Sequence, residues 1–323
     1  MTVVVVTGAS AGVGRATARA FAARGATLAL IARGGDGLRA AVDEIETGGG
    51  RAAAFELDVA DSSAVENATA TIEHELGPID VWVNNAMVSV FSPVSELTAD
   101  DVKRVTEVTY LGYVYGTLCA LERMRSRGRG TIVQVGSALS YRAVPLQAAY
   151  CAAKHAIEGF TEALRCELLH EGGDIRVTMV QLPAVNTPQF DWVRTRLAGR
   201  PRPVAPIVQP EVAAAAIVWA ADKAPRELKV GWSTVRAVYL NRIVPGRLDR
   251  YLAKRGYEAQ QEKAPVARDR QDNLFAPMPG DRGAHGRFDA ESHAHSRLLE
   301  ARFVVGNVGN ALRRGAAIVK RDD

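Results

Sequence analysis

Residues 3–14 read VVVVTGASAGVG and set the organisation of the first half of the chain. The four valines Val3–Val6 form a continuous β-branched run, which predicts a strand that is buried on both faces. The glycine-rich turn that follows leads directly into the helix-forming run Arg15–Arg24. In such a unit the glycines let the backbone approach a pyrophosphate, and free helical N–H groups point at it. We therefore predict a dinucleotide site at this turn; glycines that serve only close helix packing are the alternative.

Strand and helix patterns then alternate up to about residue 235. The predicted strands are Thr27–Ala32, Arg51–Leu57, Ile79–Val83, Thr131–Val135, Ile175–Val180 and a short one over Leu228–Gly231. The predicted helices are Ser62–Leu76, Val102–Met124, Tyr150–Leu169 and Pro210–Ala221. Repeated β-α units with buried strands predict an α/β fold, a doubly wound parallel sheet of Rossmann type with about seven strands.

The end of the second strand bears on which dinucleotide binds. An acidic residue there would accept hydrogen bonds from a ribose 2′-hydroxyl, whereas an arginine can pair with a 2′-phosphate. Arg33 stands at this position, and Arg15 lies close by in the glycine turn. The sequence therefore predicts NADP in preference to NAD. A solvated surface arginine is the alternative, since Asp36 is also near.

Three residues around the fifth strand form a candidate catalytic group. Ser137 follows that strand, and Tyr150 and Lys154 stand four apart in helix-forming sequence, so their side chains share one helix face. A nearby cation lowers the pKa of a phenol from its usual value of about 10, which suits acid–base work at neutral pH. The Tyr-x-x-x-Lys spacing also occurs by chance in ordinary helices, so it needs support from the rest of the chain.

In their order and spacing these motifs resemble those of the short-chain dehydrogenase/reductase family. The resemblance covers residues 1–235 and is carried by Thr7-Gly8-x-x-x-Gly12-x-Gly14, Asp58-Val59, Asn84-Asn85-Ala86, Ser137 and Tyr150-x-x-x-Lys154. It implies hydride transfer between NADP(H) and a carbonyl or secondary alcohol. Tyr150 would be the acid or base, Ser137 would bond the carbonyl oxygen, and Lys154 would lower the Tyr150 pKa and bind the nicotinamide ribose.

The resemblance also implies a set of cofactor contacts. These are Gly8, Ser10, Ala11, Gly12, Val13, Gly14, Arg33, Asp58, Val59, Asn85, Ala86, Tyr150, Lys154, Val185 and Thr187. Three positions depart from the family pattern: Thr109 replaces a catalytic asparagine, Met87 replaces a glycine, and Leu182-Pro183 stands where Pro-Gly is usual. We expect Thr109 to bend its helix and to preserve the proton relay in altered form.

Residues 184–209 match the segment that closes over substrate in the family. Phe190, Trp192, Val193 and Leu197 lie in this lid, and Leu139, Tyr141 and Val144 follow Ser137. An apolar wall of this kind predicts an apolar or aromatic substrate. The alternative is that these side chains pack the lid on the sheet.

Residues 236–323 form a C-terminal extension. Residues 236–256 predict two short amphipathic helices broken at Pro245-Gly246. Residues 260–295 are polar and rich in Pro, Gly, Asp and Arg, so we expect them to be poorly ordered. The apolar positions in 301–319 recur at helical spacing beside basic residues; docking on a second copy or disorder is favoured over peripheral membrane contact.

Composition argues against nucleic-acid binding and against metal or redox sites. The 323 residues carry 40 Lys and Arg against 36 Asp and Glu, a net charge of +4 that does not point to nucleic acid. Cys119, Cys151 and Cys166 lack metal or redox spacing and read as small buried groups. His285, His293 and His295 show no metal partner set, so we expect no metal.

The expected location and assembly follow from the same evidence. No stretch predicts a signal peptide or a membrane span, so the expected location is cytoplasmic. The family resemblance implies a homodimer or homotetramer through two long helices. A rival interpretation is a catalytically weak member that uses this fold as a binding or redox-sensing module; Thr109 and Met87 favour it, and the intact Ser137, Tyr150 and Lys154 oppose it.

Overall fold

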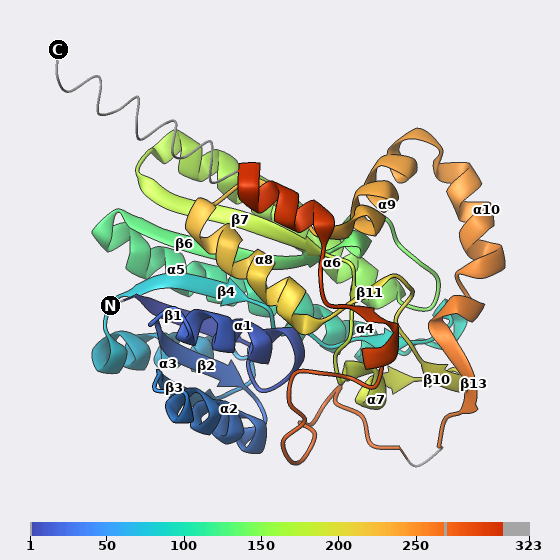
Figure 1. The fold of residues 1–323 in the computed structure, drawn as a ribbon, viewed down its shortest axis with the longest axis horizontal. Coiled ribbons are helices and arrows are strands. Elements are labelled where there is room, and N and C mark those ends of the chain that lie inside the picture. Colours follow the sequence, from blue (N-terminus) through green and yellow to red (C-terminus); the bar gives the residue numbers. More distant parts are fainter. Residues whose placement is uncertain (1, 268–269, 306–323) are drawn as a thin grey trace.

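A seven-stranded parallel sheet forms the centre of the computed structural model, which describes residues 2–267 and 270–305. The strand order is β12-β7-β6-β4-β1-β2-β3 (Figure 1). The bounds are β1 (Val3–Thr7), β2 (Thr27–Ala32), β3 (Arg51–Glu56), β4 (Ile79–Asn84), β6 (Arg129–Ser137), β7 (Asp174–Leu182) and β12 (Glu227–Lys229). The predicted doubly wound α/β sheet is confirmed.

Helices cover both faces of this sheet. They are α1 (Gly12–Ala22), α2 (Gly35–Thr47), α3 (Ser62–Leu76), α4 (Ala99–Thr106), α5 (Gly112–Arg127), α6 (Ala148–Glu171) and α8 (Pro210–Lys223). The valines of β1 show why the strand is apolar throughout: Val4 and Val6 pack into one core cluster, and Val3 and Val5 into the cluster on the opposite face.

The long helix predicted over Val102–Met124 is wrong in one respect. A π-helical turn, Glu107–Leu111, separates α4 from α5. Thr109 lies in that turn, and its hydroxyl donates to the Val88 carbonyl (2.8 Å) and accepts from the Val88 N–H (3.1 Å). The hydroxyl thus ties the turn to the segment after β4, and such π-turns are common near functional sites.

The C-terminal extension packs back on the domain. Helices α9 (Gly231–Ile243) and α10 (Pro245–Arg255) come first, with the break at Pro245. Strand β13 (Gln261–Pro265) then pairs with β10 (Gly199–Pro201), and β14 (Ser292–His293) pairs with β11 (Ile207–Val208), itself paired with β8 (Ala184–Val185). The remaining short elements are β5 (Val90–Phe91), α7 (Gln189–Trp192) and β9 (Arg194–Thr195).

The expectation of poor order over residues 260–295 is therefore wrong for the described residues of that segment. This polar segment contains two large buried apolar side chains, Leu274 and Phe288. It also forms ion pairs with Asp191, Arg194 and Arg202 of the lid. Beyond it residues 297–305 are helical, and Phe303 stacks on Trp219. The rest of the amphipathic stretch expected over 301–319 lies outside the described residues. Among the helices described, none is long and apolar enough to cross a membrane.

Candidate active site

The carboxyl ends of β1, β4, β6 and β7 open onto a cavity of about 470 Å³. This edge is where doubly wound sheets bind ligands. The predicted site residues that line the cavity are Gly8, Ser10, Ala11, Gly12, Val13, Arg33, Asp58, Val59, Asn85, Ala86, Ser137, Tyr150, Lys154, Val185 and Thr187. Gly14 and Thr109 do not line the cavity. Gly14 packs closely against Gly8, and Thr109 is hydrogen-bonded to Val88, so each contacts a residue that does line it.

The glycine turn has a backbone shape that lets a ligand approach it closely. Gly8 has φ +68°, and a Cβ there would lie 2.8 Å from the Ala86 Cα. Gly12 has φ +58° and begins α1, so its N–H is one of the helix N-terminal donors. Asn85 holds the neighbouring strand ends together by donating from Nδ2 to the Thr7 carbonyl (2.9 Å). The turn therefore forms a cradle that side chains would fill, which fits a pyrophosphate.

Ser137, Tyr150 and Lys154 meet at the other end of the cavity. Ser137 is the last residue of β6, and Tyr150 and Lys154 occupy the first turns of α6. All three side chains line the same cavity. The Lys154 Nζ lies 5.6 Å from the centre of the Tyr150 ring. The structure thus brings together the three side chains predicted to do the chemistry.

The electrostatics of this group differ from the sequence expectation. Burial lowers the pKa of Lys154 to about 7. Burial also raises the pKa of the Tyr150 phenol, Cys151 adds to the rise, and the Ser137 side chain opposes it. The expected lowering of the Tyr150 pKa is therefore wrong for this structure. An ammonium with a pKa of about 7 carries only part of its charge at neutral pH, so burial outweighs its attraction for a phenolate.

Tyr113 is a buried partner of Lys154 that the sequence interpretation missed. The Lys154 Nζ donates to the Val135 carbonyl (2.7 Å) and to the Tyr113 hydroxyl (3.0 Å), and Tyr113 donates to the same carbonyl (3.0 Å). Tyr113 is 1% exposed, and burial raises the pKa of its phenol. The sequence feature that could have indicated this role is a tyrosine directly after Gly112, in α5, the helix that packs on β4 and β6.

The basic residues at the adenosine end already have partners. Arg33 donates to the carbonyls of Asn273 (2.6 Å) and Leu274 (3.2 Å) in the C-terminal extension. Asp58 pairs with Arg104 and lies 4.0 Å from Arg33. Arg15, expected to assist Arg33, is buried instead.

The contacts of Arg15 explain why it is unavailable. Its Nε pairs with Glu44 (2.6 Å), and its Nη1 donates to the Gly37 carbonyl (2.9 Å). Arg33 is thus the predicted cation that still lines the cavity.

The substrate end is apolar, as expected, but not every expected residue contributes. Leu139, Val144, Phe190, Trp192 and Met87 line the cavity. Val193 and Leu197 pack instead in a cluster with Phe91, Phe190 and Phe288. Tyr141 is not part of the wall: its hydroxyl lies between the carboxylates of Glu158 (2.6 Å) and Glu227 (2.7 Å) and can donate its one proton to either.

No cysteine or histidine of the described residues lines this cavity. All three cysteines lie in the described residues and are free thiols; Cys119 and Cys151 are buried, but Cys166 is exposed, contrary to expectation. Within residues 2–267 and 270–305, no cluster of three or more His, Cys, Asp or Glu side chains is placed to hold a metal ion. His285 pairs with Glu211 (3.0 Å) and His295 with Glu300 (3.3 Å).

Comparison with known proteins decides the family. Residues 2–197 match the family described as short chain dehydrogenase. The chain belongs to the short-chain dehydrogenase family. Within it, the chain is similar to the uncharacterized oxidoreductase YxnA of Bacillus subtilis, at 33% identity over 265 residues, which cover 81% of this chain and 74% of that protein. It is also similar to the putative oxidoreductase SadH of Mycobacterium tuberculosis, at 37% identity, covering 57% of this chain and 67% of SadH.

Two solved dehydrogenase structures are similar to this chain. A short-chain dehydrogenase from Streptomyces avermitilis superposes with a TM-score of 0.66 at 29% identity, covering 79% of this chain and 98% of that one. An alcohol dehydrogenase from Thermococcus sibiricus, solved with 5-hydroxy-NADP, has a TM-score of 0.60 at 29% identity, covering 71% of this chain and 96% of that one. The protein is an NAD(P)-dependent oxidoreductase that acts on CH–OH or carbonyl groups.

Proposed function

We propose that this short-chain dehydrogenase catalyses reversible hydride transfer between NADP(H) and a ketone, aldehyde or secondary alcohol with apolar or aromatic substituents. The observation that carries the proposal is that Ser137 and Tyr150 line one cavity together, with the buried Lys154 Nζ 5.6 Å from the centre of the Tyr150 ring. When bound, the nicotinamide would supply or accept the hydride. The protein supplies position, a proton and electrostatic stabilisation.

Each of the three residues has a distinct role in this proposal. Ser137 donates a hydrogen bond to the carbonyl oxygen, where negative charge develops. Tyr150 gives its proton to that oxygen during reduction and removes it during oxidation. Because burial keeps the Tyr150 phenol protonated at neutral pH, the site is prepared for reduction. Lys154 is anchored by Tyr113 and Val135 and orients the nicotinamide ribose beside Tyr150.

NADP is the proposed cofactor. The cradle at Gly8 and Gly12 fits a pyrophosphate, and Val185 and Thr187 line the cavity where a nicotinamide carboxamide would reach. Arg33, at the end of β2, supports binding of a 2′-phosphate. A metagenomic short-chain oxidoreductase solved in complex with NADP has a TM-score of 0.59 at 27% identity, covering 71% of this chain and 95% of that one, which also supports the choice.

A screen of carbonyl compounds tests the proposal directly. Oxidation of NADPH and of NADH would be followed at 340 nm against aliphatic, aromatic and polar ketones and aldehydes. We expect turnover with apolar or aromatic carbonyls, faster with NADPH. Turnover confined to small polar carbonyls would refute the substrate class, and faster turnover with NADH would refute the cofactor choice.

The rival function, a binding or redox-sensing module, makes a different prediction for Tyr150→Phe. The substitution removes the proton donor and keeps the ring. An enzyme should lose turnover and retain NADPH affinity, whereas a module should keep both its fold and its partner. Burying Lys154 costs stability. This cost favours the catalytic function over the binding module, because a binding module does not require a buried lysine at this position.

Two partner proposals concern the surface. We propose a homodimer or homotetramer formed through α5 and α6, where Leu118 and Leu169 are exposed. Light scattering after size exclusion tests it: Leu169→Asp should reduce the mass to that of one chain if this face is the interface. An unchanged oligomer would place the interface elsewhere.

The second partner proposal is peripheral contact of α9 and α10 with an anionic membrane; these helices project at one edge of the molecule (Figure 1). Trp232, Tyr239, Ile243 and Tyr251 are exposed there, among the basic residues Arg236, Arg242, Arg247, Arg250, Lys254 and Arg255. The positive charge of this face attracts anionic lipid, and it repels the same face of a second copy of the protein. Sedimentation with anionic vesicles should fall for Ile243→Asp but not for Leu169→Asp; equal sedimentation of both would contradict it.

A further inference from the structure

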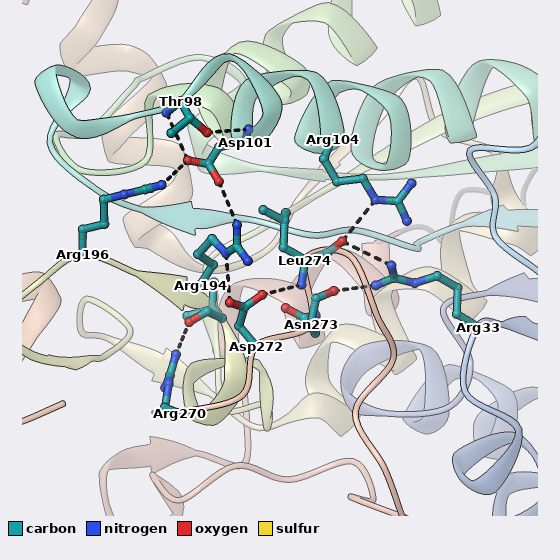
Figure 2. Close-up of polar contacts among 11 residues, drawn as sticks. Arg33, Thr98, Asp101, Arg104, Arg194, Arg196, Arg270, Asp272, Asn273 and Leu274 are labelled. Carbon is teal, nitrogen blue, oxygen red and sulfur yellow. Dashed lines mark hydrogen bonds and ion pairs between the residues drawn. The ribbon is translucent and has the colours of Figure 1, made fainter. Parts of the chain in front are cut away.

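The C-terminal residues 272–288, here called the clamp, run along the groove that the glycine turn and Arg33 define. We propose that the clamp is a third wall of the dinucleotide site and that it must open for the cofactor to exchange. The inference rests on the proposed function, since it assigns a role to this segment in binding the same cofactor. Figure 2 shows the part of the clamp that meets Arg33 and Arg104.

Clamp carbonyls occupy the donors that a dinucleotide phosphate would use. The Gly283 carbonyl accepts from the Gly12 N–H (3.1 Å), at the N-terminus of α1. The Asn273 and Leu274 carbonyls accept from Arg33 (2.6 and 3.2 Å), and the Leu274 carbonyl also accepts from Arg104 (3.1 Å). Since these donors lie at the glycine turn and at the end of β2, the clamp holds both phosphate-binding regions of the groove.

The clamp covers the cavity without filling it. Asn273, Pro277, Met278, Gly280 and Arg282 line the same cavity of about 470 Å³ as the glycine turn and the catalytic side chains. The Gly280 N–H donates to Asp36 (3.0 Å), which holds the clamp to the start of α2. The cavity therefore runs between the clamp and the sheet. A dinucleotide bound there would take the Gly12 and Arg33 donors from the clamp carbonyls, with the sheet on one side of it and the clamp on the other.

Leu274 is the apolar anchor of the clamp. Its side chain is fully buried, in the core cluster that includes Val59 and Val108 at the adenosine end. The adjacent Phe275 is 52% exposed. Leu274 is therefore the buried apolar contact of this part of the clamp, and Phe275 is not. We expect truncation of Leu274 to loosen the clamp more than truncation of Phe275.

Ion pairs join the clamp to the substrate lid. Arg194, in β9 of the lid, pairs with Asp272 of the clamp (2.9 Å) and with Asp101 of α4 (3.2 Å), as Figure 2 shows. Arg196 of the lid also pairs with Asp101 (2.5 Å). Just before the clamp, Arg270 donates to the Asp191 carbonyl (2.8 Å). Opening the clamp must break the Arg194–Asp272 pair or move the lid, so cofactor exchange and lid opening are coupled.

Dissociation of NADPH measured by stopped-flow fluorescence tests the inference on the full chain. The bound NADPH would be displaced by excess NADP⁺. We expect Leu274→Ala to accelerate dissociation at least tenfold over the parent. The matched control is Leu299→Ala, a similarly buried leucine of the same extension that lies outside the clamp, which should leave the rate unchanged. Equal rates for the parent and Leu274→Ala would overturn the clamp.

A second pair of variants keeps the test valid if Leu274→Ala does not fold. Asp272→Asn weakens the joint with Arg194, whereas Glu300→Gln removes a pairing within the extension. We expect Asp272→Asn alone to speed NADPH release and to raise the KM for the carbonyl substrate. Faster release without a change in KM would overturn the coupling to the lid.

The outcomes separate this inference from the proposed function. Binding of NADPH with unchanged release in the variants refutes the clamp and leaves the enzyme intact. Binding by Leu274→Ala but not by the parent supports the clamp as a closed gate. If no variant and no parent binds either dinucleotide, the proposed function fails and the clamp fails with it.

Discussion

Replacing Lys154 by methionine should change how the stability of the protein depends on pH. The side chain is 2% exposed, and burial lowers its pKa from 10.5 to about 7. Methionine keeps most of the volume and carries no charge. The Tyr113 hydroxyl still donates to the Val135 carbonyl at 3.0 Å, so the substitution need not leave that carbonyl without a donor. The comparison therefore isolates the free energy of burying the ammonium.

The sign follows from the protons bound in each state. Between pH 7 and 10.5 the unfolded chain holds a proton on Lys154 that the folded chain has lost, so the stability of the parent rises with pH in this window. From about pH 6.5 to 9.5 the rise amounts to about 3 kcal/mol, at about 1.4 kcal/mol per pH unit for full release. Lys154→Met lacks this contribution, so its advantage over the parent should be largest below pH 7 and should shrink above it.

Urea unfolding followed by far-UV circular dichroism at the two pH values gives the required free energies. Lys103→Met is the matched control, because the Lys103 side chain is 73% exposed and should carry little of this pH dependence. We expect the difference between Lys154→Met and the parent to change by about 3 kcal/mol between the two pH values. If Lys154→Met and Lys103→Met show the same pH dependence, the ammonium is not buried as described and the reasoning is wrong.

Three further substitutions test the site. Tyr113→Phe removes a partner of the Lys154 ammonium, so kcat should fall by about tenfold and the alkaline limb of the kcat/KM profile should shift, while Tyr115→Phe on the same helix changes neither. Gly8→Ala should abolish NADPH binding and destabilise the fold by about 1–3 kcal/mol in thermal unfolding, more than Gly25→Ala, which shares the positive φ but has open space around it. Arg33→Ala should weaken NADPH about tenfold more than NADH in fluorescence titrations; equal weakening would contradict a 2′-phosphate contact.

Local patterns were enough to predict the sheet and to place Tyr150 and Lys154 on one helix face at the cavity. The β-branched run Val3–Val6 specifies a strand buried on two faces, and the Tyr150 and Lys154 spacing specifies a shared helix face, whatever lies elsewhere in the chain. The burial of that helix face could not be read from the spacing. This is why the pKa of Tyr150 was predicted to fall, whereas desolvation raises it.

The contacts that the sequence did not predict join residues far apart in the chain. Arg33 and Asn273 are 240 positions apart, and Arg194 and Asp272 are 78 apart, so no periodicity relates them. The polar composition of the clamp resembles that of a disordered segment because arginines and aspartates supply its contacts, with few apolar anchors such as Leu274. The contact of Tyr113 with Lys154 is of the same kind, since the two residues lie 41 positions apart.

Proton transfer by Tyr150 in a nicotinamide-dependent reaction at this cavity is the step on which the proposed function depends. The most direct measurement is a paired one on Tyr150→Phe and the parent: the Kd for NADPH by fluorescence, and the rate of NADPH oxidation with a carbonyl that the parent reduces. We expect a Kd for NADPH within about twofold of the parent and a rate of NADPH oxidation at least about 100-fold lower. Undiminished oxidation by Tyr150→Phe would contradict this expectation.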